Sequence, residues 1–265
     1  MTTQDVGVQR KKYRSRRALV ILLVIVVVLV AGFFVADYFA KKFATDYVRT
    51  QIASALGLPS SAPVTVDLGS GSILLQAATG AIDHVTVGVN PIVLDGLSGS
   101  ATLVATGVPL NETTPVKTLD VKVFVPTTTI TTAISRVPSL SSLKPVVTIV
   151  GKNVAVTGTV SVFGFPQAIG ATLTPTVTKG APGYTIDTAS FDGVTVSASV
   201  LDRYLPGLTT SLESGSSLCI ANELPKAFTL TRIAVQGQSL VSTFAGNGVE
   251  LNADSLSQKG SCGGN

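Results

Sequence analysis

The stretch "VTVDLGSGSILLQAATGAIDHVTVGV", residues 64–89, contains the pattern from which the fold class follows. Its two ends are short runs rich in Val, Thr and Ile, and such runs are typical of β-strands. Between them, residues 72–79 predict a short helix that ends at Gly80, since glycine commonly follows the last turn of a helix. The stretch therefore predicts a strand, a short helix and a second strand.

Similar short runs follow one another from Pro63 onward, separated by Gly, Pro, Asn and Asp. Strands at such short spacing pair antiparallel, because a parallel pair needs a long crossover connection. No break in composition divides this part of the chain, so it is expected to form one β-rich α+β domain. Tight turns are expected at residues 151–153 and 246–248, and further short helices at residues 127–136 and 197–205.

Residues 18–36 form the apolar run "ALVILLVIVVVLVAGFFVA", which carries no charge. At 1.5 Å per residue, this run spans roughly the ~30 Å hydrocarbon core of a bilayer. A cleavable signal has a core of about 7–15 residues and a small-x-small exit, whereas here the bulky Phe34 stands at the nearest exit. The run favours an uncleaved transmembrane anchor; the alternatives are a cleaved signal and a buried core helix.

The charges are divided unevenly between the two sides of this run. Residues 1–17 hold six basic groups and one acid, and the rest of the chain holds 13 basic and 14 acidic groups. The positive-inside rule predicts a single-pass topology with a cytoplasmic basic tail and with residues 37–265 in the periplasm or cell envelope. Because the large part is almost neutral, its charge excludes nucleic acid as a partner.

Residues 37–56 predict an amphipathic helix that continues directly from the anchor and ends before Gly57 and Pro59. Its apolar residues fit either of two roles, packing in a core or lining a lipid-facing groove. The residues expected to form its apolar stripe are Phe39, Phe43, Tyr47 and Ile52.

The sequence contains no motif of a catalytic, metal or cofactor site. Its one histidine, His84, lies in a predicted strand beside Asp83, and neighbouring strand residues point to opposite faces. No nucleophile elbow, P-loop, dinucleotide fingerprint or zinc spacing occurs. The prediction is therefore a protein without catalytic residues, metal or cofactor, in which His84 is structural.

The only two cysteines, Cys219 and Cys262, both follow the anchor. Outside the cytoplasm, two cysteines are expected to form a disulfide bond. Two cysteines alone are also too few to form a structural zinc site. A disulfide here would close a loop of 43 residues. In the chain-entropy model such a loop is worth about 4 kcal/mol.

Several segments together resemble the LmeA family of actinobacterial cell-envelope proteins. The resemblance covers residues 37–262 and is carried by the helix closing at Gly80, by Val125-Pro126 opening a helix, and by the Cys-x-x-x-x-Leu-Pro motif at 219–225. It implies phospholipid binding linked to elongation of the mannan of lipomannan. It also implies a tubular, TULIP-like fold, in which a curved sheet wraps against a helix. The implied partners are phospholipid and the plasma membrane; no protein partner is implied.

A lipid-cradling fold needs an apolar groove, and transfer of an acyl chain from bilayer to groove is nearly neutral in free energy. The residues expected to line this groove are Phe39, Phe43, Tyr47, Ile52, Phe163, Phe165 and Phe191. The alternatives are an envelope protein of the LEA-2 type, suggested by Asn90-Pro91 in "VTVGVNPIVL", and a sandwich-type interaction module. Neither alternative carries lipid, and a sandwich-type module would have a solid core where a lipid carrier has a continuous apolar cavity.

Overall fold

The computed structural model describes residues 12–55, 63–94, 96–111, 113–196, 225–246, 248–250 and 252–260. The helices are α1 (Lys12–Ala55), α2 (Ile73–Thr79), α3 (Thr127–Ser135), α4 (Pro138–Ser141) and α7 (Ala253–Ser257). The first strands are β1 (Val64–Asp67), β2 (Ala81–Leu94), β3 (Leu97–Pro109), β4 (Thr118–Pro126) and β5 (Val146–Val150). The later strands are β6 (Asn153–Val162), β7 (Phe165–Thr178), β8 (Ala181–Phe191), β9 (Val194–Val196), β10 (Phe228–Gln236) and β11 (Ser239–Gly246).

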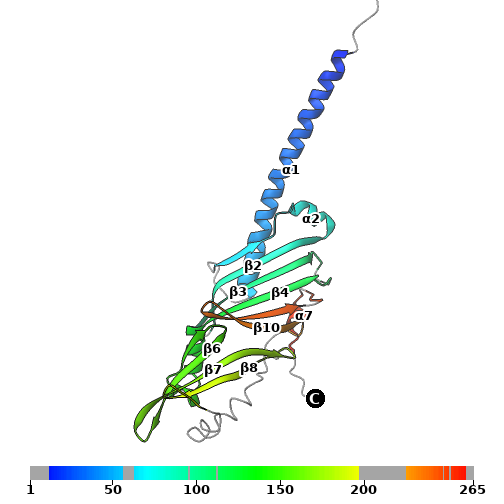
Figure 1. Ribbon diagram of the computed structural model, residues 1–265. Coiled ribbons are helices and arrows are strands. Elements are labelled where there is room, and N and C mark those ends of the chain that lie inside the picture. Colours follow the sequence, from blue (N-terminus) through cyan, green and yellow to red (C-terminus); the bar gives the residue numbers. More distant parts are fainter. Residues whose placement is uncertain are drawn as a thin grey trace, which may run out of the picture.

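The strands form two open antiparallel sheets. One has six strands in the order β1-β2-β3-β4-β11-β10, and the other has five in the order β5-β6-β7-β8-β9. The sheets meet where β10 contacts β7 and β8, so they follow one another along an elongated body (Figure 1). The expected β-rich α+β class is confirmed, with two sheets in place of a single curved one.

The five-stranded sheet has one aliphatic face and one hydroxyl-rich face. Its antiparallel register aligns Val156, Ala171 and Ala189 across β6, β7 and β8. One residue along the strands, the side chains belong to the opposite face, where Thr172 and Thr188 are paired. Alternation with period two therefore gives this sheet an apolar surface that needs a cover.

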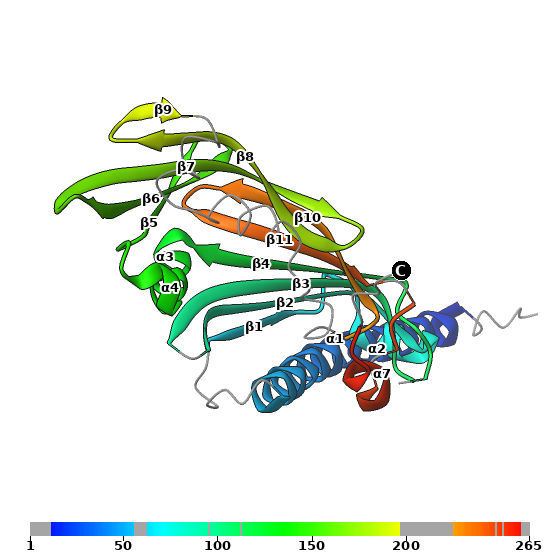
Figure 2. The same cartoon turned by 90° about the horizontal axis from the view of Figure 1, so that it is seen from below.

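Helix α1 is one continuous helix of 44 residues, about 66 Å long at 1.5 Å per residue. It contains a segment that is long and apolar enough to cross a membrane. The most apolar part of this segment has a mean hydropathy of 2.8, and none of its residues is buried inside the protein. The predicted anchor and the predicted amphipathic helix are therefore two parts of the same helix. Its N-terminal part projects from one end of the body, and its last turns lie against β1 (Figures 1 and 2).

Hydrogen bonds join α1 to the start of α2. The Oδ1 atom of Asp37 accepts from the Ser72 hydroxyl at 2.8 Å and from the Leu74 backbone N–H at 3.0 Å. The Lys41 ammonium donates to the backbone carbonyl of Gly69. These bonds hold α1 in place directly after the predicted anchor, because α2 belongs to the folded body.

Helix α2 begins and ends as its sequence predicts. The Ser72 Oγ atom accepts from the Leu75 N–H at 3.3 Å and caps the first turn. Gly80 follows the helix with a φ of 81°, a left-handed conformation that glycine adopts without a steric cost. The predicted helix at 127–136 is likewise confirmed as α3, and the predicted turn is present at Gly151-Lys152. The predicted helix at 197–205, Cys219 and Cys262 lie outside the described residues, as does residue 247 in the predicted turn at 246–248.

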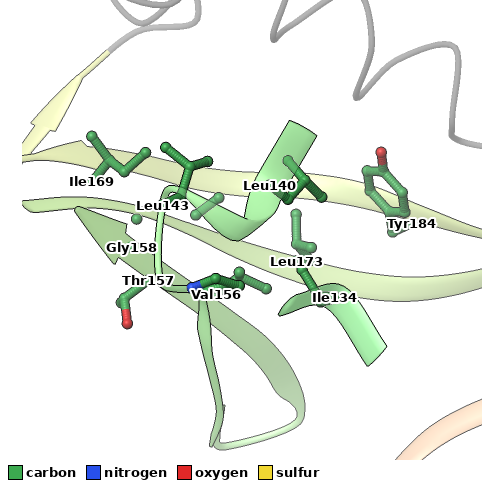
Figure 3. A pocket seen from close by; sticks show the side chains of 12 residues that line it. Ile134, Leu140, Leu143, Val156, Thr157, Gly158, Ile169, Leu173 and Tyr184 are labelled. Carbon is green, nitrogen blue, oxygen red and sulfur yellow. The ribbon is translucent and has the colours of Figure 1, made fainter. Parts of the chain in front are cut away.

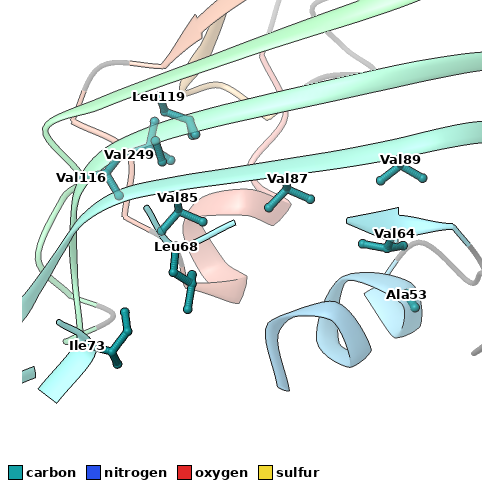
Figure 4. Close-up of a cluster of buried hydrophobic side chains, with 11 residues drawn as sticks. Ala53, Val64, Leu68, Ile73, Val85, Val87, Val89, Val116, Leu119 and Val249 are labelled. Atoms are coloured by element: carbon teal, nitrogen blue, oxygen red, sulfur yellow. The ribbon is translucent and has the colours of Figure 1, made fainter. Parts of the chain in front are cut away.

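A cluster of buried aliphatic side chains joins α1 to the six-stranded sheet (Figure 4). Leu68 is 1 % exposed and Val249 is fully buried, although they are far apart in sequence. The cluster contains Ala53, Val64, Leu68, Ile73, Val85, Val87, Val89, Ala105, Val116, Leu119 and Val249. This core lies on the side of the six-stranded sheet that faces α1.

We expect Leu68→Ala to lower the free energy of unfolding by about 2–5 kcal/mol, because it removes buried methyl groups and leaves a cavity. Leu110→Ala is the matched control, since Leu110 is 54 % exposed. Denaturant unfolding of the two variants measures the difference. Equal stability for both would show that Leu68 does not belong to the core.

A candidate apolar binding site

An apolar cavity of about 210 Å³ lies between helices α3 and α4 and the aliphatic face of the five-stranded sheet (Figure 3). Strands β6, β7 and β8 provide its sheet wall, and α3, α4 and the segment before β5 provide the opposite wall. The residues that line it are Ile134, Leu140, Leu143, Pro145, Val156, Thr157, Gly158, Ile169, Gly170, Ala171, Leu173 and Tyr184.

The helical wall of the cavity is fixed to the sheet at Gly158. The Thr159 backbone N–H donates to the Leu143 carbonyl oxygen at 2.7 Å. A Cβ atom on residue 158 would lie 2.9 Å from this same oxygen, so only glycine admits the close approach. The segment after α4 can therefore lie directly on β6.

Small residues on the sheet give the cavity its depth. Ala171 pairs with Val156, and two pairs further along the ladder Ile169 pairs with Gly158. The larger side chains of Ile169 and Leu173 stand on either side of Ala171 along β7. Because α3 and α4 contain only nine and four residues, they cover this aliphatic face incompletely.

Among the residues that the structure describes, none with a charged side chain lines the cavity, and Thr157 and Tyr184 are the only polar residues of the lining. Burial raises the pKa of the Tyr184 phenol above its ordinary value of 10.0, because the ionised form would lose hydration. Burial of an apolar chain in such a site stabilises the complex by about 0.8 kcal/mol per CH₂ group relative to water. The cavity is therefore suited to hydrocarbon.

The predicted groove residues of α1 lie away from this cavity. Phe39, Phe43 and Tyr47 are 63 %, 75 % and 58 % exposed, whereas Ile52 is half-buried against the core. Ile52 follows Phe43 by nine residues, and at about 100° per residue this spacing places the two on opposite sides of the helix. Ile52 therefore does not lie on one stripe of α1 with Phe43.

The three predicted phenylalanines of the sheet also separate. Phe163 and Phe165 are 94 % and 69 % exposed at the turn between β6 and β7. Phe191 is half-buried at the end of β8 and pairs with Ile169, which lines the cavity. The structure thus brings only Phe191 of the seven predicted residues beside the cavity, and lipid binding by the seven residues stays a prediction.

Sequence reasoning missed the aliphatic lining because it gave most weight to aromatic residues. A signal was present in the alternation of β6 and β7, where Val, Ile and Leu at every second position share one face with Gly158 and Ala171. The pairing of small with large residues across two strands depends on the strand register, and this register cannot be read from the sequence.

His84 lies on the six-stranded sheet, exposed, with Nε2 at 3.0 Å from the Thr86 Oγ1 atom. Among the residues that the structure describes, no group of three or more His, Cys, Asp or Glu side chains is arranged to hold a metal ion.

The model of a family described as LmeA-like phospholipid-binding matches residues 35–245. This range begins near the end of the apolar run and includes every residue that lines the cavity. No curated protein and no solved structure matches the chain significantly.

The raised pKa of Tyr184 predicts that the stability of the folded protein decreases at high pH. The folded chain keeps this phenol neutral at a pH at which it would ionise after unfolding, so stability should fall as the pH rises from about 10 through the folded-state pKa. Tyr184→Phe should remove this loss and a component of the tyrosinate absorbance that titrates above the ordinary pKa of the phenol. If the variant removed an ordinary component instead, the burial of Tyr184 would be contradicted.

Proposed function

Because the chain belongs to the LmeA-like phospholipid-binding family, we propose that it holds a phospholipid acyl chain in the cavity between α3, α4 and the five-stranded sheet. The observation that carries this proposal is that no charged residue occurs among the described residues that line the cavity. A sandwich-type interaction module would have a solid core here, so the cavity favours lipid cargo over that alternative.

The cavity volume of about 210 Å³ indicates what part of the lipid is held. It is below the roughly 300–1,000 Å³ of pockets that enclose a whole drug-sized ligand. We therefore assign it to a segment of acyl chain, with the polar headgroup outside the apolar lining. Phe191 would extend this binding surface, because it pairs with Ile169 on the same aliphatic face.

Loading and release need no chemical fuel in this proposal. The acyl chain leaves one apolar environment, the bilayer, for another, the cavity, so the net transfer free energy is small. A binding role is further supported by the description of the family, which names a ligand and no reaction. The protein would then act as a carrier or sensor of phospholipid.

We further propose that α1 stays in the plasma membrane as an anchor. Six basic residues precede the apolar run of residues 18–36, which supports a cytoplasmic N-terminus and an extracytoplasmic domain over residues 37–265. The bonds that Asp37 and Lys41 make to the α2 region support the same arrangement, because they attach the folded body directly after this run. In that compartment Cys219 and Cys262 would form a disulfide.

The exposed aromatic residues of α1 fit the membrane surface better than a protein groove. Phe39, Phe43 and Tyr47 follow the apolar run on the side of α1 away from Ile52, and aromatic side chains are enriched at the membrane–water interface. We also propose a place for this protein in the elongation or maintenance of a cell-envelope lipoglycan such as lipomannan, as the resemblance of its sequence to the LmeA family implies.

We expect the purified full-length chain to retain phospholipid and Ala171→Asp to reduce the retained amount at least tenfold, because a carboxylate in the apolar cavity would lose its hydration. The matched control is Thr172→Asp on the next residue of β7, whose side chain lies on the hydroxyl-rich face. Ala171→Phe fills the cavity without adding charge and should also displace lipid. Mass spectrometry of extracted lipid gives the amounts, and a wild-type chain without phospholipid would refute the proposal.

The proposed topology predicts protease sensitivity in intact cells. External protease should digest residues 37–265 and leave a tag placed before residue 1 protected. Cell fractionation with antibodies to each end provides the readout. Protection of the C-terminal domain would contradict the orientation, and release of that domain into the medium would indicate cleavage of the anchor.

A further inference from the structure

We infer that the turn between β6 and β7, with Phe163 and Phe165 at its tip, docks on a second lipid surface, opposite the membrane that α1 enters. The inference rests on the proposed function for the position of α1. The tip itself is defined by its two phenylalanines, whose side chains are 94 % and 69 % exposed.

The turn does not need a phenylalanine for its own stability. Phe163 has a φ of 51° and Gly164 a φ of 86°, so both central residues of this two-residue hairpin turn are left-handed. A bulky residue is a steric outlier in this conformation, for which Asn, Asp and Gly are favoured.

Two other hairpins of the same protein have the same geometry with a charged residue in place of Phe163. Lys179 has a φ of 51° before Gly180, and Asp192 has a φ of 50° before Gly193. Both side chains are charged and well solvated by water. A strained and fully exposed phenylalanine at the equivalent position points to a role outside folding.

The chemistry of the whole hairpin fits a lipid surface. Residues 153–178, which include all of β6 and β7, contain no Asp, Glu, Lys, Arg or His. Insertion of this tip among lipid headgroups and chains therefore removes no charge from water, while it buries two aromatic rings. A specific protein interface usually has a polar rim, and a hairpin without charges offers little to build one.

The tip lies at the end of the body opposite the N-terminal part of α1 in both views (Figures 1 and 2). A chain anchored through α1 would thus present this tip to a different lipid surface. The same two strands carry Val156, Ile169 and Ala171 of the cavity wall. A docked tip would place the strands of the cavity wall next to the lipid surface, which gives a lipid a short path between bilayer and cavity.

The chain contains no tryptophan, so Phe163→Trp creates a single fluorophore at the tip. The full-length variant is inserted into nanodiscs of ordinary phosphatidylcholine and mixed with separate liposomes of phosphatidylcholine with brominated chains. We expect a blue shift and quenching by the liposomes. Leu110→Trp, an exposed position hydrogen-bonded to the end of α2, is the matched control and should show neither.

Phe163→Asp separates docking from folding, because it installs the Asp-Gly pair that the turn at Asp192-Gly193 already uses. We expect an unchanged or higher Tm and a loss of liposome partitioning of about tenfold or more, since a buried Phe side chain accounts for at least that ratio. Wild-type partitioning should not depend on salt, because the hairpin has no charge to be screened.

Three results would overturn the inference: no quenching of the tip fluorophore, equal quenching of the Leu110→Trp control, or quenching only when the brominated lipid is in the nanodisc. Retained phospholipid is measured on the same samples. A chain that retains phospholipid without tip quenching refutes the docking alone. A chain whose tip is quenched while it retains no phospholipid supports the docking and refutes the proposed function.

Discussion

The antiparallel register of the five-stranded sheet is the constraint on which the candidate site depends. It collects aliphatic side chains of β6, β7 and β8 on one face and hydroxyl side chains on the other. An apolar face must be covered, and within the described part of the chain the cover consists of the two short helices that follow β4. Because that cover is incomplete and Ala171 and Gly158 are small, an apolar cavity is left between the two layers.

The buried core and the candidate binding cavity lie against different sheets. The buried cluster around Leu68 and Leu119 joins the six-stranded sheet to α1, while the cavity lies against the five-stranded sheet. A cavity has lost packing contacts along its walls, so it weakens the region that contains it. The separation lets the protein keep an unfilled site without opening the core that holds the body to α1.

Helix α1 is one continuous helix that contains both the apolar run and the turns that pack against the six-stranded sheet. Its apolar run, residues 18–36, carries no charged side chain on any side, whereas its last turns place Ala44 and Ala53 toward the sheet and leave the aromatic residues outside. Small residues allow the helix to approach the sheet closely, and Asp37 and Lys41 fix its position through polar bonds to the α2 region. The orientation of the body relative to the helix is therefore set by side chains immediately after the apolar run.

Local patterns in the sequence determined the fold class, the extent of α2 with Gly80, the start of α3 after Pro126 and the apolar run in α1, because each depends on neighbouring residues. Tertiary structure decided which residues form the cavity. Ile134 and Leu140 reach Val156 and Ala171 only through the packing of α3 and α4 on the sheet, and Gly158 is required only because the Leu143 carbonyl lies against it. Aromatic residues such as Phe43 and Phe163 looked equally suited to a groove, yet their exposure depends on the orientation of α1 and on the end of a hairpin. Contacts between residues distant in sequence carry no local signal, and for that physical reason the site could be found only in the folded chain.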